Sequence, residues 1–176
     1  MKMAYADPPY FGTAAKFYGA HHPDAANYDR LETHAALLDR LEAEFDGWAY
    51  SLGTPSLRDI LPLAPPHARV GAWVKPFCSF KPNVNPAYAW EPVIYKIGRK
   101  RGRDQPTVRD FCSAEIALKK GLTGAKPPAF CWWIFDLIGL EPDDEFVDIF
   151  PGSGSVQKAW TKYREVMIGF PLGFAD

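Results

Sequence analysis

Apolar and polar positions along the first half of the chain form two kinds of pattern. Short apolar runs at 2–6, 48–52 and 69–74 predict buried strands. The β-branched and aromatic residues within 88–97 predict a fourth strand. Between residues 29 and 45, apolar side chains recur every three or four positions, which predicts an amphipathic helix with one buried stripe.

The second half continues the alternation of helix and strand. A helix is predicted from Pro127 to about Ile138, and a strand is predicted over 145–150. A glycine-rich turn at 151–155 then leads into a helix over about 156–166. Because strands and helices mostly alternate, the pattern favours an α/β layered sheet.

Three segments give weaker patterns. Residues 11–28 are rich in Gly, Ala, His and Pro and show no period, which predicts a long loop beside the preceding strand. Thr54 and Pro55 predict the start of a short helix, with Thr54 as its N-cap. The segment 107–118 fits either a strand or a short helix.

Composition indicates a globular chain of one domain. The 176 residues are 47% hydrophobic, and no apolar run reaches the length of a membrane span. The amino terminus lacks a signal segment, and Cys78, Cys112 and Cys131 fit neither a disulfide framework nor a zinc pattern, so we expect a cytoplasmic protein. His21 and His22 have no nearby ligand set, and no metal is expected.

Charge is concentrated in one segment although the formal net charge is only -1. Nine lysines and arginines but three acidic residues lie between Lys96 and Lys126, so the rest of the chain is acidic. A local basic segment on an acidic body is typical of phosphate contact. A solvated loop with lysines that aid solubility is the plainer interpretation.

The tetrapeptide Asp7-Pro8-Pro9-Tyr10 carries the most specific chemistry. An exocyclic NH2 on a nucleobase is a poor nucleophile because its lone pair is delocalised into the ring. Two acceptors that each take one N–H turn the lone pair out of the plane, and the Asp7 carboxylate and the Pro8 carbonyl can serve as these acceptors. Tyr10 can stack on the base. An ordinary turn after a strand is the alternative.

A second motif runs from Asp148 to Ser155 at a strand-to-helix junction. Glycines at 152 and 154 allow a ligand to approach the backbone, and a helix amino terminus offers N–H groups. A plain strand-loop-helix turn would have the same glycines. In an open parallel sheet both motifs would lie at the carboxyl ends of strands, where ligands bind.

With these motifs the chain resembles the amino-methylating DNA methyltransferases, as a compact, phage-type member of their permuted β-like class. Asp7-Pro8-Pro9-Tyr10 resembles their catalytic motif, and the acidic first residue is typical of enzymes that methylate adenine N6. The resemblance implies a Rossmann-like open twisted sheet, mostly parallel and flanked by helices, in circularly permuted topology. It also implies S-adenosylmethionine as the cofactor, held by Asp148, Phe150, Gly152, Gly154, Ser155, Lys126 and Pro127.

The resemblance also implies a partner and a role in the cell. DNA would enter with a flipped adenine, and residues 98–126 would form a short target-recognition region. We expect Arg99, Lys100, Arg101 and Arg103 to bind phosphates. The phage type suggests methylation that protects DNA from restriction. Neither a membrane nor a metal is expected.

The sequence departs from the family pattern mainly at its carboxyl end. Ile149 and Ser155 replace the usual proline and threonine. Only a short stretch follows Ser155, so one or two edge strands are expected to be missing, and a homodimer could complete the cofactor site.

Other functions stay open at this point. One is a catalytically decayed or truncated DNA-binding relative, and another is an amino-methyltransferase acting on RNA or protein glutamine. A Rossmann-type oxidoreductase would need a fuller G-x-G-x-x-G pattern, and position 157 is Gln.

Overall fold

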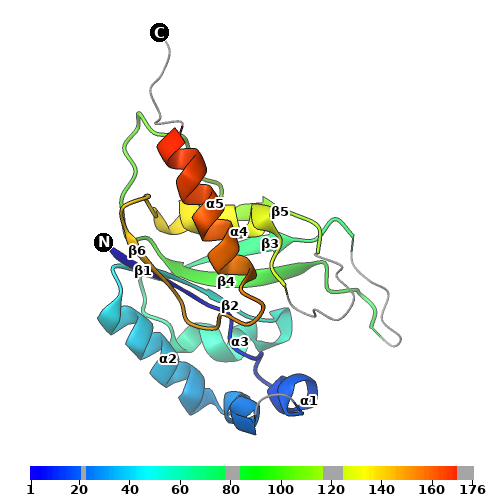
Figure 1. Cartoon of the computed structure of the whole chain (residues 1–176). Helices are drawn as coiled ribbons and strands as arrows, with labels where there is room; N and C mark the ends of the chain where they lie inside the picture. Colours follow the sequence, from blue (N-terminus) through cyan, green and yellow to red (C-terminus); the bar gives the residue numbers. More distant parts are fainter. Residues whose placement is uncertain (21–22, 78–83, 117–124, 170–176) are drawn as a thin grey trace.

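Six strands form one sheet in the order β5-β3-β4-β2-β1-β6 in the computed structural model, which describes residues 1–20, 23–77, 84–116 and 125–169 (Figure 1). The strands are β1 (Lys2–Ala6), β2 (Gly47–Ser51), β3 (Arg69–Val74), β4 (Trp90–Lys96), β5 (Phe111–Ser113) and β6 (Glu145–Asp148). The strands predicted at 2–6 and 69–74 are confirmed in full, and those at 48–52, 88–97 and 145–150 are confirmed with shifted or shorter ends.

The sheet is mixed. β1 lies parallel to both β2 and β6, and β3 lies parallel to β5. β4 is antiparallel to both of its neighbours, β2 and β3. The predicted α/β open sheet is confirmed. Among the described strands, three pairs are parallel, and both antiparallel pairs involve β4. Among the described residues, β6 forms one edge of the sheet.

Helices cover both faces of this sheet. The helical elements are α1 (Ala14–Tyr18), η1 (Pro23–Asp29), α2 (Leu31–Glu44), η2 (Thr54–Ser56), α3 (Leu57–Ile60), η3 (Leu61–Leu63), α4 (Pro128–Ile138) and α5 (Ser155–Gly169). Figure 1 shows α4 and α5 on one side of the sheet and α2 and α3 on the other. No helix within the described ranges combines the length and the apolar character that crossing a membrane requires.

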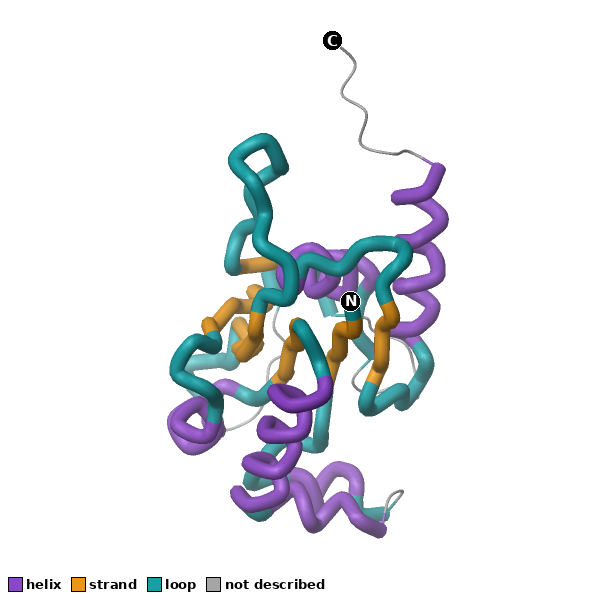
Figure 2. The backbone as a smooth tube through the Cα atoms, turned by 90° about the vertical axis from the view of Figure 1, so that its left-hand side faces the viewer, coloured by secondary structure: helices purple, strands orange, loops and turns teal. Residues whose placement is uncertain are grey.

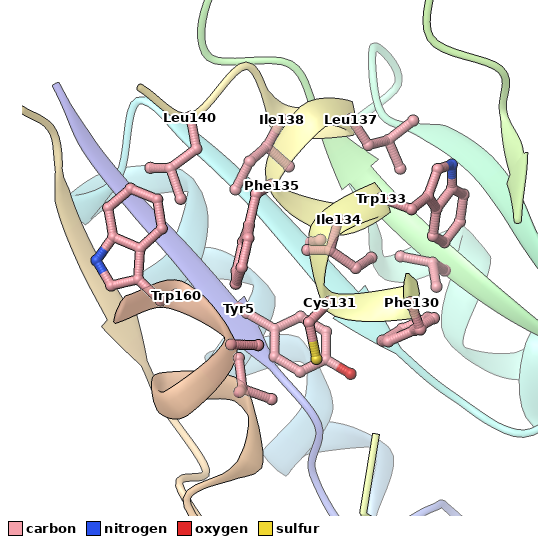
Figure 3. Packing of buried hydrophobic residues seen from close by; sticks show 14 of the residues in the cluster. Tyr5, Phe130, Cys131, Trp133, Ile134, Phe135, Leu137, Ile138, Leu140 and Trp160 are labelled. Carbon is pink, nitrogen blue, oxygen red and sulfur yellow. The ribbon is translucent and has the colours of Figure 1, made fainter. Parts of the chain in front are cut away.

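Each face of the sheet has its own core because successive side chains of a strand point to opposite faces. In β1, Met3 and Tyr5 pack under α4 and α5, whereas Ala4 and Ala6 pack against α2. The first core is rich in aromatic rings, including Phe130, and Figure 3 shows it between β1 and the two helices. β1 is therefore buried on both faces and holds the residues that follow it in a fixed place.

The segment 11–28, predicted as a loop, contains α1 and most of η1, so that prediction was wrong. The Asp29 side chain accepts hydrogen bonds from the Ala14 and Ala15 amides at 2.9 Å each, and it thereby caps α1 from a distance along the chain. A helix of five residues has too few internal hydrogen bonds to be stable alone. Its stability comes from this distant cap, which leaves no local pattern in the sequence.

Two other local predictions are resolved by the structure. Thr54 is not an N-cap, because Gly53 takes that position and the Thr54 hydroxyl donates to the Trp90 carbonyl instead, at 2.8 Å. The ambiguous segment 107–118 contributes a strand, β5, rather than a helix.

Asp144, directly before β6, links the amino terminus to the loop after β4. It accepts hydrogen bonds from the Met1 ammonium at 2.8 Å and from Arg99 Nη1 at 2.7 Å. Burial alone would raise the pKa of Asp144, but Arg99 and the amino terminus hold it well below its usual value. This cluster fixes the amino end of β1 to the loop after β4.

Arg99→Ala is expected to lower the free energy of unfolding by about 2 kcal/mol, because it removes charged hydrogen bonds to a buried carboxylate. Urea denaturation would measure the loss, with the exposed neighbour Lys100→Ala as a control that should change stability by less than about 0.5 kcal/mol. Because the pKa of Asp144 is lowered in the folded state, its contribution is present above about pH 4 and decreases below it. An equal loss at pH 3 and pH 7 would contradict this role.

Candidate active site

The two motifs found in the sequence meet at the carboxyl ends of two neighbouring strands. β1 and β6 are parallel, with Tyr5 opposite Asp148, and the Ile149 amide donates to the Tyr5 carbonyl at 2.9 Å. Asp7 follows β1 directly, and the glycine-rich turn follows β6. The ladder therefore brings the first ten residues and the segment 148–155 to one edge of the sheet, as the sequence predicts, and the partly exposed Asp7 and the open space beside Gly154 mark the candidate cleft there.

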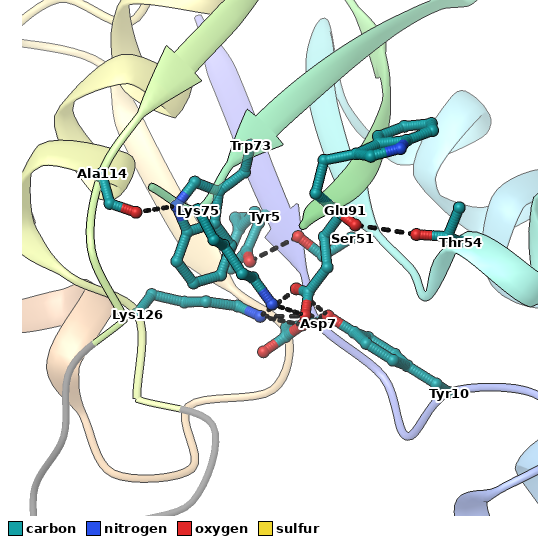
Figure 4. A network of polar contacts seen from close by, with 11 residues as sticks. Tyr5, Asp7, Tyr10, Ser51, Thr54, Trp73, Lys75, Glu91, Ala114 and Lys126 are labelled. Atoms are coloured by element: carbon teal, nitrogen blue, oxygen red, sulfur yellow. Dashed lines mark hydrogen bonds and ion pairs between the residues drawn. The ribbon is translucent and has the colours of Figure 1, made fainter. Parts of the chain in front are cut away.

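Asp7 lies in a polar cluster within this cleft (Figure 4). Its Oδ1 is 2.9 Å from Lys126 Nζ and 3.5 Å from the Tyr10 hydroxyl. Lys126 also donates to the Tyr10 hydroxyl at 3.2 Å. Lys126, expected from the resemblance to bind the cofactor, thus contacts the candidate catalytic carboxylate.

Glu91 and Lys75 complete the cluster, and sequence reasoning missed both. Glu91 Oε2 accepts a hydrogen bond from the Tyr10 hydroxyl at 2.9 Å and lies 3.9 Å from Lys126 Nζ. Glu91 Oε1 pairs with Lys75. The sequence signals are weak: Glu91 is an acidic residue in a mostly apolar strand, and Lys75 directly follows β3. The two come together only through the pairing of Trp73 with Glu91 in the ladder.

The cluster is largely shielded from water. The Lys126 side chain is 6% exposed, whereas that of Asp7 is 22% exposed. Burial raises the pKa of Asp7, and Lys126 opposes this rise. Burial alone would lower the pKa of Lys126 and raise that of Glu91, but the opposite charges around each group reverse both effects. The partners therefore keep Lys126 and Glu91 charged.

Aromatic rings pack around the Lys126 ammonium and shield it from water. Its Nζ lies 5.5 Å from the ring centre of Trp73 and 5.8 Å from that of Phe130, and these two rings are 4.8 Å apart. The Tyr10 ring lies on another side of the ammonium, at 5.7 Å. These rings attract the cation and exclude water, which strengthens the charge interactions within the cluster.

The glycine-rich turn has the backbone that its sequence predicts. Gly152 and Gly154 have positive φ angles of 43° and 69°, which side chains with a Cβ rarely adopt. A Cβ added at Gly154 would meet no atom within 4 Å, so the space beside the turn is open. Ser155 is the first residue of α5, and the first amides of a helix have no hydrogen-bond partners within it.

Asp148 is a buried carboxylate without a partner. Neither side-chain oxygen forms a hydrogen bond with any of the described residues. Burial raises the pKa of Asp148 to about 6; the nearby Phe150 amide opposes this rise, and the charge of Asp7 adds to it. Leaving a buried carboxylate unpaired is costly. The position fits a ligand that brings a cationic or N–H group to it.

Two further residues expected from the resemblance have structural contacts. Phe150 packs edge-on against Tyr28 at 5.6 Å, which ties the glycine-rich turn to the layer that contains α2. Pro127 is the N-cap residue of α4 and places Lys126 at the cleft.

The basic loop lies at the other end of the sheet. The contacts of Arg99 with Asp144 place it beside the amino end of β1, about 16 Å from the carboxyl end at 3.3 Å per residue. Figure 2 shows this loop standing out on the side away from α1 and α2. Arg101 pairs with Asp136 at 3.3 Å, whereas Lys100 and Arg103 are exposed. Residues 117–124, also part of the predicted basic insert, lie outside the described residues.

No group of three or more His, Cys, Asp or Glu side chains that could hold a metal ion occurs in the described part of the chain. His21, His22 and Cys78, for which the sequence analysis expected neither a metal site nor a disulfide framework, lie outside it. Cys112 and Cys131 are free thiols.

Comparison with known proteins identifies the fold. No protein-family model and no curated protein matches the chain. Among the solved structures, the chain is similar to M1.HpyAVI in a crystal structure of its complex with SAM, with a TM-score of 0.61 and 15% sequence identity. The match covers 93% of this chain and 78% of that one. The fold expected from the resemblance is therefore confirmed.

Proposed function

We propose that the chain is a DNA methyltransferase that uses S-adenosylmethionine to methylate the N6 amino group of adenine. The observation that carries the proposal is the meeting of Asp7 and the unpaired Asp148 at the carboxyl ends of β1 and β6. The fold shared with the M1.HpyAVI–SAM complex supports it.

The residues of the glycine-rich turn fit S-adenosylmethionine. Asp148 offers a buried carboxylate to a cationic ligand, and S-adenosylmethionine carries an ammonium and a sulfonium. Gly152, Gly154 and Ser155 offer open backbone and helix amides to its polar groups. Phe150 fixes the turn, and Lys126 and Pro127 bound the cleft on the opposite side. When bound, the cofactor supplies an electrophilic methyl group.

The chain's own part in the reaction is positioning. Asp7 and the Pro8 carbonyl accept the two N6 hydrogens of an adenine turned out of the duplex, and Pro9 keeps this turn rigid. The nitrogen lone pair then faces the methyl group. With a methyl donor bound there, Asp7 would take up the amino proton that the nitrogen loses on becoming methylated. Tyr10 borders the base, and no covalent enzyme intermediate is needed.

DNA contact and assembly are further parts of the proposal. Arg99 and Arg101 are already paired with Asp144 and Asp136, so within the predicted set we assign phosphate contact to Lys100 and Arg103. Because β6 forms an edge of the described sheet, a second copy of the chain beside it would complete the wall of the cofactor site.

Two measurements test the proposal. Calorimetry should show S-adenosylmethionine binding, and S-adenosylmethionine with a labelled methyl group should transfer its label to DNA. No cofactor binding would instead favour a decayed DNA-binding relative. Label in RNA or in protein glutamine, with none in DNA, would assign the same chemistry to a different acceptor.

A further inference from the structure

The two oxygens of the Asp7 carboxylate have different surroundings. Oδ1 faces both Lys126 Nζ, at 2.9 Å, and the Tyr10 hydroxyl, at 3.5 Å. Oδ2 accepts no hydrogen bond from any residue that the structure describes, and the Asp7 side chain keeps 22% of its surface exposed. One oxygen is thus held by two partners, while the other is left without a hydrogen-bond donor.

The groups that hold Oδ1 are themselves held by Glu91. The Tyr10 hydroxyl donates to Glu91 Oε2 at 2.9 Å, and Lys126 Nζ lies 3.9 Å from the same oxygen. Lys75 anchors the other oxygen of Glu91 from the end of β3, and its amide donates to the Ala89 carbonyl at 2.8 Å. Glu91 therefore sits on a rigid pair of strands and links it to the cleft.

We propose that Lys126 and Glu91 are positioning residues for Asp7. Lys126 holds Oδ1 so that Oδ2 points at the substrate amino group, and Glu91 fixes Lys126 and Tyr10 in the arrangement that makes this possible. The role of both residues in catalysis rests on the proposed function, but the arrangement itself does not.

The charges of the cluster support this role. Two carboxylates and two ammonium groups balance in a volume from which water is largely excluded, where each interaction is strong. A carboxylate must be ionised to accept an amino hydrogen. Burial raises the pKa of Asp7, Lys126 lowers it and Glu91 raises it, so the two partners act on Asp7 with opposite signs.

Titratable groups on several elements lie near Asp7, and of these Lys126, Glu91 and Tyr10 act on its pKa. The groups near it are Tyr5 on β1, Tyr10 after β1, Tyr18 on α1, Tyr50 on β2, Glu91 on β4, Lys126 before α4, Cys131 on α4 and Asp148 on β6, and Lys75 after β3 pairs with Glu91. Of these, only Lys126 and Glu91 combine a full charge with an ion pair or hydrogen bond that fixes the orientation of Asp7 or its direct partners.

The arrangement is tested on the protein without cofactor or DNA. Carbon-13 NMR of labelled aspartate side chains would follow the titration of Asp7 in the wild type, Lys126→Met and Glu91→Gln. We expect the pKa of Asp7 to rise in Lys126→Met and to fall in Glu91→Gln. Lys126→Arg, which keeps the charge, should restore a value near that of the wild type. Shifts of the same sign in the first two variants, or none, would overturn the proposal.

Kinetics then test the consequence for the reaction. Lys126→Met should lower kcat by about 100-fold, because the Asp7 carboxylate is no longer held in its reactive position, while KM for S-adenosylmethionine changes little. The acid limb of its pH profile should move to higher pH, and that of Glu91→Gln to lower pH. If Lys126 had only a structural role, the acid limb of Lys126→Met would stay at the pH of the wild type. If Lys126→Met does not fold, Glu91→Gln and Lys126→Arg keep the test decisive, because an unchanged limb in Glu91→Gln would refute the proposal.

The two proposals fail in distinguishable ways. If the wild type methylates no acceptor, the proposed function is wrong, and the NMR titration still decides whether Lys126 and Glu91 control Asp7. If the wild type methylates DNA but the titration does not respond to these variants, only the positioning role is wrong.

Discussion

Replacing Asp7 by alanine is expected to abolish methyl transfer, with a loss of at least about 1000-fold in kcat, because one of the two acceptors that redirect the nitrogen lone pair disappears. The change leaves Lys126 with Glu91 as its remaining carboxylate partner, so the fold should persist. Transfer of labelled methyl groups to DNA measures the loss, and circular dichroism checks the fold.

Asp7→Asn tests the same role of Asp7 with a smaller change in the side chain. The amide keeps the size of the side chain but turns one acceptor into a donor, which opposes an amino N–H. Activity should therefore fall nearly as far as in Asp7→Ala. Asp39→Asn, an exposed aspartate on α2, is the matched control and should retain full activity. Full activity in Asp7→Ala would reject the assignment of Asp7.

Asp148→Asn is expected to have two opposite effects. Affinity for S-adenosylmethionine should fall by about 10- to 100-fold, because a charged hydrogen-bond partner of the cofactor is lost. The protein without cofactor should become more stable at pH 7, because a buried carboxylate without a partner is replaced by a neutral amide. Calorimetry measures the first effect, and thermal unfolding measures the second.

The raised pKa of Asp148 also determines how the stability of the fold changes with pH. The folded pKa of Asp148 is raised to about 6, above its unfolded value, so its protonated form stabilises the fold below about pH 4. This contribution is lost as the pH rises through 6, at a cost of about 1–2 kcal/mol once partial contact with solvent is allowed for. The variant should not show this loss.

The matched control for Asp148→Asn is Asp143→Asn, in the exposed loop before β6. It should change neither cofactor affinity nor the pH dependence of unfolding. Tighter cofactor binding in Asp148→Asn, or lower stability at pH 7 than the wild type, would show that Asp148 does not face the cofactor.

The sequence predicts the elements that carry strong local patterns. The stripe of Leu38 and Leu41 identified α2, and Gly139 marked the end of α4 with the left-handed conformation that a glycine favours. The two motifs could be paired in advance because the carboxyl ends of parallel strands share one edge of a sheet. The prediction thus depended on the parallel order of β1 and β6, which the structure has.

Features made by distant contacts could not be predicted in the same way. The cap of α1 depends on Asp29, and the polar cluster around Asp7 draws on the end of β3, on β4 and on the segment before α4. The basic loop was predicted as part of a target-recognition region that binds phosphates, yet Arg99 is held by Asp144 beside the amino end of β1. Its place follows from the antiparallel direction of β4, which local sequence does not specify.

The central claim is that one cleft brings a methyl donor to an adenine amino group. Its most direct test is mass spectrometry of nucleosides from DNA that has been incubated with the protein and S-adenosylmethionine carrying a deuterated methyl group. We predict N6-methyldeoxyadenosine with the intact deuterated methyl group, formed by the wild type and not by Asp7→Ala. Unmodified nucleosides, despite bound cofactor and folded protein, or equal product from Asp7→Ala, would contradict the claim.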